Sequence, residues 1–153
     1  MTNPTIKELV DRYIELSFSV NKKAESLIKC QIGDDLTNDQ HYILRYIEKK
    51  EVCTSTELAE VFEVKKSAIT AIINRMWEKG LIQRNRDEKD RRVIYLTLSD
   101  EGKELFEKTE TRIHKLVEHL IKQFDQHEIE QFIRTYEKLE HVIAESKDFQ
   151  LED

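Results

Sequence analysis

The segment Val64–Ser99 limits the possible folds of this chain more than any other part of the sequence. It begins with an amphipathic pattern of helical period that ends at Gly80, where a left-handed helix cap is expected. Two alternating runs follow, Leu81–Arg86 and Arg92–Leu98, separated by the charged turn Asp87–Arg91. A helix followed by a β-hairpin, with basic residues at the helix start and the hairpin tip, is the arrangement of a winged helix-turn-helix.

Charge is distributed unevenly along the chain. Between Val64 and Arg92, nine basic residues stand against four acidic ones, which gives this segment a net charge of +5. The whole chain carries −6, so the remainder carries −11. Attraction to phosphate is local, because salt screens exposed charges beyond about 10 Å. The basic segment therefore indicates double-stranded nucleic acid as a partner despite the acidic total, whereas an isolated charge run would be an ordinary solvated face.

Composition and the missing motifs exclude several classes of protein. Among 153 residues, no apolar run reaches the roughly 20 residues of a membrane span, and the N-terminus lacks the regions of a signal peptide. The two cysteines, Cys30 and Cys53, are too few for a disulfide framework. No catalytic set, phosphate loop or strong metal motif is evident. We expect a cytoplasmic protein that is not an enzyme, needs no cofactor and has no membrane partner.

Helix-start patterns and apolar stripes organise the rest of the chain. Capping patterns occur at Thr37, Thr54 and Asp125, and Ser99 precedes two acidic residues, as at a helix start. With the apolar periodicity, they predict helices at about residues 5–28, 38–49, 55–62, 66–79, 100–124 and 126–146. The fold class is thus mainly α with a small β-hairpin.

The outermost helices carry apolar stripes that have no obvious core of their own. Such faces must be buried somewhere, and a second copy of the chain is the expected partner. We interpret residues 1–153 as a single domain, with a winged helix-turn-helix lobe at 36–98 and dimerisation helices at 5–30 and 100–146.

Three motifs resemble the MarR family of bacterial transcriptional regulators. LTNDQHYILRYI is similar to the family's second helix, and STELAEVFEVKKSAITAIINRMWEKGLIQR is similar to its helix-turn-helix. EKDRRVIYLTLSDEGKEL resembles the wing signature, in which D-x-R precedes a strand and L-T/S-x-x-G follows. The resemblance implies a homodimeric repressor that binds a palindromic operator and responds to a small-molecule effector. The alternative is a winged-helix adaptor for other proteins that has lost DNA binding.

The helix at 66–79 and the hairpin supply the candidate DNA-binding residues. Ser67, Thr70 and Asn74 share one helix face, and hydroxyl and amide groups can contact base edges, with Asn suited to adenine. Asp90 and Arg92 match the D-x-R pair, in which a carboxylate would hold the guanidinium for the minor groove or merely stabilise the turn. The remaining candidates are basic residues expected at the DNA backbone, namely Lys65, Lys66, Arg75, Arg84, Arg86, Lys89 and Arg91.

The sequence leaves open which chemistry the protein senses. By the resemblance, effector-binding candidates are Tyr13, Phe18, His41, Tyr42 and Arg45, for which packing in a dimer core is an equal alternative. A zinc-responsive branch of the family makes Cys30 and His41 suggestive, and a redox role for Cys30 or Cys53 is a further possibility. His114 and His119 point about 140° apart on a helix and cannot easily share one ion. We therefore predict no metal site.

Overall fold

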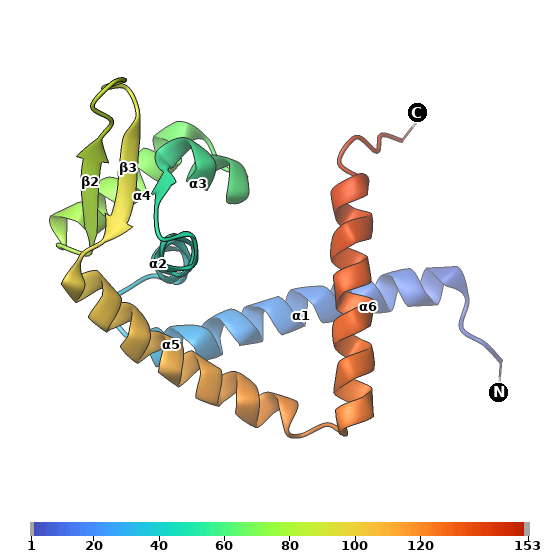
Figure 1. The fold of residues 1–153 in the computed structure, drawn as a ribbon. Coiled ribbons are helices and arrows are strands. Elements are labelled where there is room, and N and C mark those ends of the chain that lie inside the picture. Colours follow the sequence, from blue (N-terminus) through green and yellow to red (C-terminus); the bar gives the residue numbers. More distant parts are fainter. Residues whose placement is uncertain (1, 152–153) are drawn as a thin grey trace. The chain divides into compact units, whose positions relative to one another are not determined.

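The computed structural model describes residues 2–151 of the chain, drawn in Figure 1. It confirms the mainly α fold class with a β-hairpin. The chain forms two compact units, residues 1–113 and 114–153, and the division between a lobe at 36–98 and flanking dimerisation helices stays a prediction. In chain order the elements are α1 (Ile6–Ile32), α2 (Asn38–Lys50), β1 (Cys53–Thr54), α3 (Ser55–Val61), α4 (Lys66–Glu78), β2 (Ile82–Arg86), β3 (Ile94–Leu98), α5 (Asp100–Ile121) and α6 (Gln126–Glu145).

Local sequence explains where several helices begin. The Thr37 hydroxyl accepts from the Gln40 N–H, and the Gln40 side-chain oxygen accepts from the Thr37 N–H, which is the complete capping box that the sequence predicts. Thr54 caps α3 by accepting from the Glu57 N–H at 3.2 Å. Asp125 is the N-cap residue of α6, as the sequence predicts, but its side chain makes no capping hydrogen bond.

The strands form one antiparallel sheet in the order β1-β3-β2. Strands β2 and β3 are the predicted hairpin, with Arg86 opposite Ile94 next to the turn. Strand β2 begins one residue later than the alternating run in the sequence and ends at Arg86 as predicted. Strand β3 begins at Ile94, because the turn extends to Val93, whose carbonyl accepts from the Asp87 N–H. Strand β1, in which Cys53 pairs with Leu96, was not predicted, since two residues give no periodic signal.

Aliphatic side chains from α2, α3, α4 and the sheet form the core of the first unit. Removing one such side chain from water stabilises a fold by roughly 1.5–3 kcal/mol, so this core fixes α4 against the sheet. The fully or nearly fully buried members include Ile43, Leu44, Ile47, Leu58, Ile69, Ile73, Met76 and Leu96.

Close backbone contacts join the hairpin to α5. The Ser99 N–H donates to the Leu81 carbonyl at 3.0 Å, and the Ser99 hydroxyl accepts from the Gly102 N–H at 3.0 Å. A Cβ atom at Gly102 would lie 2.1 Å from the Leu81 carbonyl oxygen, so only glycine fits this position. Gly80 has a φ of 77°, which confirms the left-handed cap after α4.

Helices α1 and α6 leave most of their apolar side chains exposed. In α1 only Ile32 is buried, and no described residue of α6 is buried. None of the helices within residues 2–151 has the length and apolarity needed to cross a bilayer. The large exposed apolar side chains on these two helices are Ile6, Leu9, Val10, Tyr13, Ile14, Leu16, Phe18, Val20 and Leu27 in α1, and Phe132, Ile133, Tyr136, Val142 and Ile143 in α6.

Candidate nucleic-acid interface

A groove of about 490 Å³ lies between α4, the start of α3 and the β-sheet. Five of the predicted DNA-binding residues line it, which places side chains from the helix and from the hairpin around one hollow. Its polar and charged lining residues are Thr54, Ser55, Thr56, Lys66, Thr70, Asn74, Arg84 and Arg92. The groove therefore combines three cations with hydroxyl and amide groups and contains no carboxylate among these lining residues.

The other predicted DNA-binding residues lie outside this groove. Lys65 is the N-cap position of α4 and makes no side-chain cap bond, and Ser67 and Arg75 are exposed on α4.

Within the groove, the Thr70 hydroxyl donates to the Lys66 carbonyl at 2.8 Å. Because its proton is used within the helix, the Thr70 hydroxyl can act only as an acceptor toward a ligand of the groove.

Arg84 reaches from β2 to two side chains of α4. Its guanidinium lies over the ring of Trp77, with Cζ 4.9 Å from the ring centroid, and it donates to the side-chain oxygen of Asn74. Cation–π contact and hydrogen bond together fix a long side chain that would otherwise be free to rotate. The exposed face of α4 is thus tied to the hairpin.

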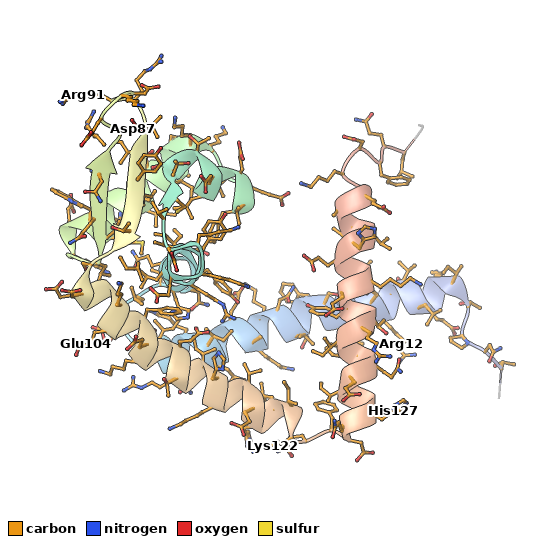
Figure 2. The ribbon with its side chains drawn as sticks, viewed as in Figure 1. Arg12, Asp87, Arg91, Glu104, Lys122 and His127 are labelled. Carbon is orange, nitrogen blue, oxygen red and sulfur yellow. The ribbon has the colours of Figure 1, made fainter. Side chains whose placement is uncertain are left out.

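A carboxylate organises the turn of the hairpin, where Asp87 and Arg91 are labelled in Figure 2. The backbone N–H groups of Lys89 and Asp90 donate to Asp87 at 2.8 and 3.2 Å, and the Tyr95 hydroxyl donates to it at 3.0 Å. These bonds favour the ionised carboxylate and lower the pKa of Asp87. The same bond raises the pKa of Tyr95, because the hydroxyl proton is held by an anion.

The predicted pairing of Asp90 with Arg92 is present. Arg92 Nε donates to Asp90 Oδ1 at 3.1 Å, and the Arg92 backbone N–H donates to the same oxygen at 3.1 Å. The Arg92 side chain is nevertheless 92% exposed, against 45% for Asp90. On the same turn, Arg86 donates to the Arg91 carbonyl at 3.1 Å. Asp90 therefore restricts the direction of Arg92 without covering its guanidinium.

The effector-binding candidates do not form one site in the first unit. His41 is 2% exposed and lies between Glu110, 3.0 Å from its Nε2, and Thr109, 3.1 Å from its Nδ1. Arg45 donates to the same Glu110 at 2.6 Å. Burial lowers the pKa of His41 below its usual 6.5, although Glu110 acts in the opposite direction. These contacts place His41 and Arg45 in a polar cluster between α2 and α5.

Among the same candidates, Tyr42 lines a cavity. This hollow of about 490 Å³ lies between α1 and α2, and it also contains Asn38, whose buried side-chain oxygen has no hydrogen-bond partner. Tyr13 and Phe18 are exposed on α1 and do not line it. Within residues 2–151, no group of three or more His, Cys, Asp or Glu side chains is placed to hold a metal ion.

The two cysteines differ in environment. Cys30 is exposed on α1, whereas Cys53 is buried in β1, and burial raises its pKa to about 11. A thiol with so high a pKa is almost wholly protonated at neutral pH and is a poor nucleophile.

Sequence reasoning missed several residues of the groove and the turn. Thr54, Ser55 and Thr56 were interpreted only as a helix start, although hydroxyls beside a basic helix are also possible backbone contacts. No sequence pattern indicated the roles of Tyr95 and Trp77, because their partners Asp87 and Arg84 become their neighbours only when the hairpin forms.

Comparison with known proteins gives consistent results. The model of the MarR family matches residues 36–94. The HTH-type transcriptional repressor MdtR of Bacillus subtilis is 35% identical over 97 residues, a match that spans 63% of this chain and 63% of MdtR. A solved MepR-like protein, complexed with pseudoligands, is 32% identical with a TM-score of 0.65, covering 88% of this chain and 95% of that one. Streptococcus pneumoniae FabT, solved in complex with DNA, has the same fold, with a TM-score of 0.79 at 24% identity over 90% of this chain and 99% of FabT.

The fold is that of a winged helix-turn-helix protein. The chain belongs to the MarR family, as its sequence motifs indicate.

Proposed function

We propose that this chain is a cytoplasmic repressor that binds an approximately palindromic DNA duplex as a homodimer and releases it when a small-molecule effector binds. The observation that carries the proposal is the groove in which Lys66, Asn74, Arg84 and Arg92 converge from the helix and the hairpin. The DNA complex of FabT, which has the same fold, supports it.

In this proposal α4 enters the major groove and the hairpin lies beside it as the wing. The exposed polar side chains of α4 face base edges, and the lysines contact phosphates. Arg92 extends from the wing toward the minor groove, whose negative potential attracts a guanidinium. Asp90 holds Arg92 in this direction before DNA arrives, which reduces the entropy lost on binding.

The exposed apolar faces of α1 and α6 support the homodimer. Side chains such as Phe132, Ile133 and Tyr136 recur at helical spacing on α6 and are exposed in the single chain. Obligate dimer interfaces commonly bury about 2,000 Å² or more and are rich in such residues. Two lobes held by these helices would meet two half-sites of one duplex.

The cavity between α1 and α2 supports the response to an effector. It contains Tyr42 and the unpartnered oxygen of Asn38, which would accept a hydrogen bond from a small ligand. The solved MepR-like protein, which is complexed with pseudoligands, also supports a response to a bound ligand.

Titration of a labelled duplex tests DNA binding. The duplex is selected from a random library by the wild-type protein, and binding is followed by fluorescence anisotropy. Arg92→Ala should weaken binding about tenfold or more, by analogy with other specific arginine contacts worth about 1–3 kcal/mol. Arg112→Ala removes an equal charge from an exposed position on α5 and should change affinity little.

Salt dependence separates DNA binding from the adaptor alternative. The logarithm of the wild-type binding constant should fall with the logarithm of salt concentration, with a slope of about −0.9 for each phosphate neutralised. Failure to enrich any duplex, or a flat salt dependence, would favour the adaptor. If Arg92→Ala binds the duplex with wild-type affinity, Arg92 of the hairpin does not contribute to DNA binding.

A further inference from the structure

Arg84 and Asn74 form a pair across the candidate interface that predicts more than general attraction to DNA. Asn74 is exposed on α4, opposite the buried side chains of Ile69 and Met76, and it lines the groove. Arg84 is half-buried on β2 and also lines the groove. The hydrogen bond between their side chains therefore lies at the surface where a base would be contacted.

The chemistry of the pair fixes how the Asn74 amide is turned. A guanidinium has only N–H donors, so it must bond to the amide oxygen, not to the amide nitrogen. The guanidinium also lies over the ring of Trp77, which follows Asn74 by three positions on the same helix. Because Arg84 is held by both residues, the amide oxygen faces the hairpin and the NH2 group is left to face a ligand.

This orientation changes which base Asn74 suits. Recognition of adenine needs the amide to donate to N7 and to accept from the N6 amino group at the same time. Arg84 takes one of the two lone pairs of the amide oxygen and turns that oxygen toward the hairpin, so the amide presents mainly its NH2 donors. Two such donors match the O6 and N7 acceptors of guanine or the O4 acceptor of thymine. Adenine would place its N6 donor beside the Asn74 donors.

We propose that Arg84 is a positioning residue that sets the base preference of Asn74, turning it from adenine toward bases with an acceptor at that edge, guanine or thymine. The inference rests on the proposed function, since it needs α4 in the major groove. It reverses the adenine preference that the residue type alone suggests. Arg84 then acts on specificity through Asn74 and not through a base of its own.

The test measures base preference at every position of the duplex, by sequencing random duplexes selected by the wild-type protein and by variants. The position read by Asn74 is the one whose preference is lost in Asn74→Ala. In the wild type, that position should favour guanine or thymine over adenine about tenfold. In Arg84→Met, which keeps an apolar contact to Trp77, the preference should fall to about twofold or shift to adenine.

Arg75→Met is the matched control, because it removes an equal charge from α4 without touching Asn74. It should weaken all duplexes together and leave the ranking of bases unchanged. Trp77 is the only tryptophan of the chain, so its fluorescence reports the contact with Arg84 independently. Its emission should change in Arg84→Met and not in Arg75→Met. Arg84→Leu, which likewise has no hydrogen-bond donor, serves if Arg84→Met fails to fold and should lose the preference in the same way.

Three results would overturn the proposal. Adenine could be preferred at the Asn74 position in the wild type, Asn74→Ala could leave every position unchanged, or folded Arg84→Met or Arg84→Leu could keep the wild-type ranking. A wild-type protein that selects no duplex at all would instead overturn the proposed function, and this outcome is distinct because it appears before any variant is compared.

Discussion

Helices α2 and α6 are both amphipathic, but they differ in what covers their apolar faces. Helix α2 buries Ile43, Leu44 and Ile47 within the core of the first unit. Helix α6 exposes Phe132 and Tyr136 although they recur at the same helical spacing. An amphipathic pattern therefore predicts that a face will be covered, but not by which surface. For α2 the surface belongs to the same chain, and for α6 we propose that it belongs to a second copy.

The largest expected effect lies at the junction of the hairpin and α5. Gly102→Ala should lower the free energy of unfolding by about 3 kcal/mol, because the new Cβ would collide with the Leu81 carbonyl, 2.1 Å away. For a chain of this size that corresponds to a fall in Tm of roughly 10 °C, measured by circular dichroism. The adjacent exposed Lys103→Ala is the control and should melt like the wild type. If both variants melt at the same temperature, the junction accommodates a Cβ at residue 102 without loss of stability.

The apolar face of α6 gives the next effect. Ile133→Glu should raise the dimer dissociation constant about 100-fold, because a carboxylate in an apolar interface leaves a charge without a partner. Gln131→Glu adds the same charge to the opposite side of the helix and should leave dimerisation unchanged. Sedimentation equilibrium measures both. If the two variants associate equally well, the face of α6 that carries Ile133 is not the interface.

A smaller effect concerns pH, within the polar cluster between α2 and α5. The pKa of His41 is lowered in the folded chain, so the unfolded chain binds more protons and stability rises with pH until about 6.5, the usual histidine value. Replacing His41 with Gln should remove this contribution, which for one proton is at most about 1.4 kcal/mol per pH unit. Urea unfolding between pH 5 and 8 measures the slope, and the exposed His127→Gln is the control. If the free energy of unfolding of His41→Gln depends on pH as in the wild type, His41 is not the source of this pH dependence.

The sequence predicted all the helices of the described chain and the hairpin, because each has a period or a cap that neighbouring residues determine. The terminal residues of these elements differ by a few positions, as with α1, which continues to Ile32 before Gly33 ends it. Strand β1 was missed because its two residues depend on pairing with Leu96, which is distant in the sequence.

The candidate site was predictable in its residue types more than in its contacts. Basic and polar residues of the helix and hairpin could be named, and Asp90 could be paired with Arg92 since they are two residues apart. The pairing of Arg84 with Asn74 could not, because it joins β2 to α4 and depends on how the two pack. The burial of His41 against Glu110 is a long-range contact of the same kind.

The number of chains bound to one duplex tests the central claim most directly. Sedimentation velocity of the wild-type protein, mixed with a labelled duplex selected by it, should show a single complex of two chains and one duplex. Raising the salt concentration should release the duplex while the protein remains a dimer. The reason is that the lobes bind DNA through charge, whereas the helices of the two chains bind each other through apolar surface. A complex with one chain per duplex, or a protein that sediments as a monomer at micromolar concentration, would contradict the account.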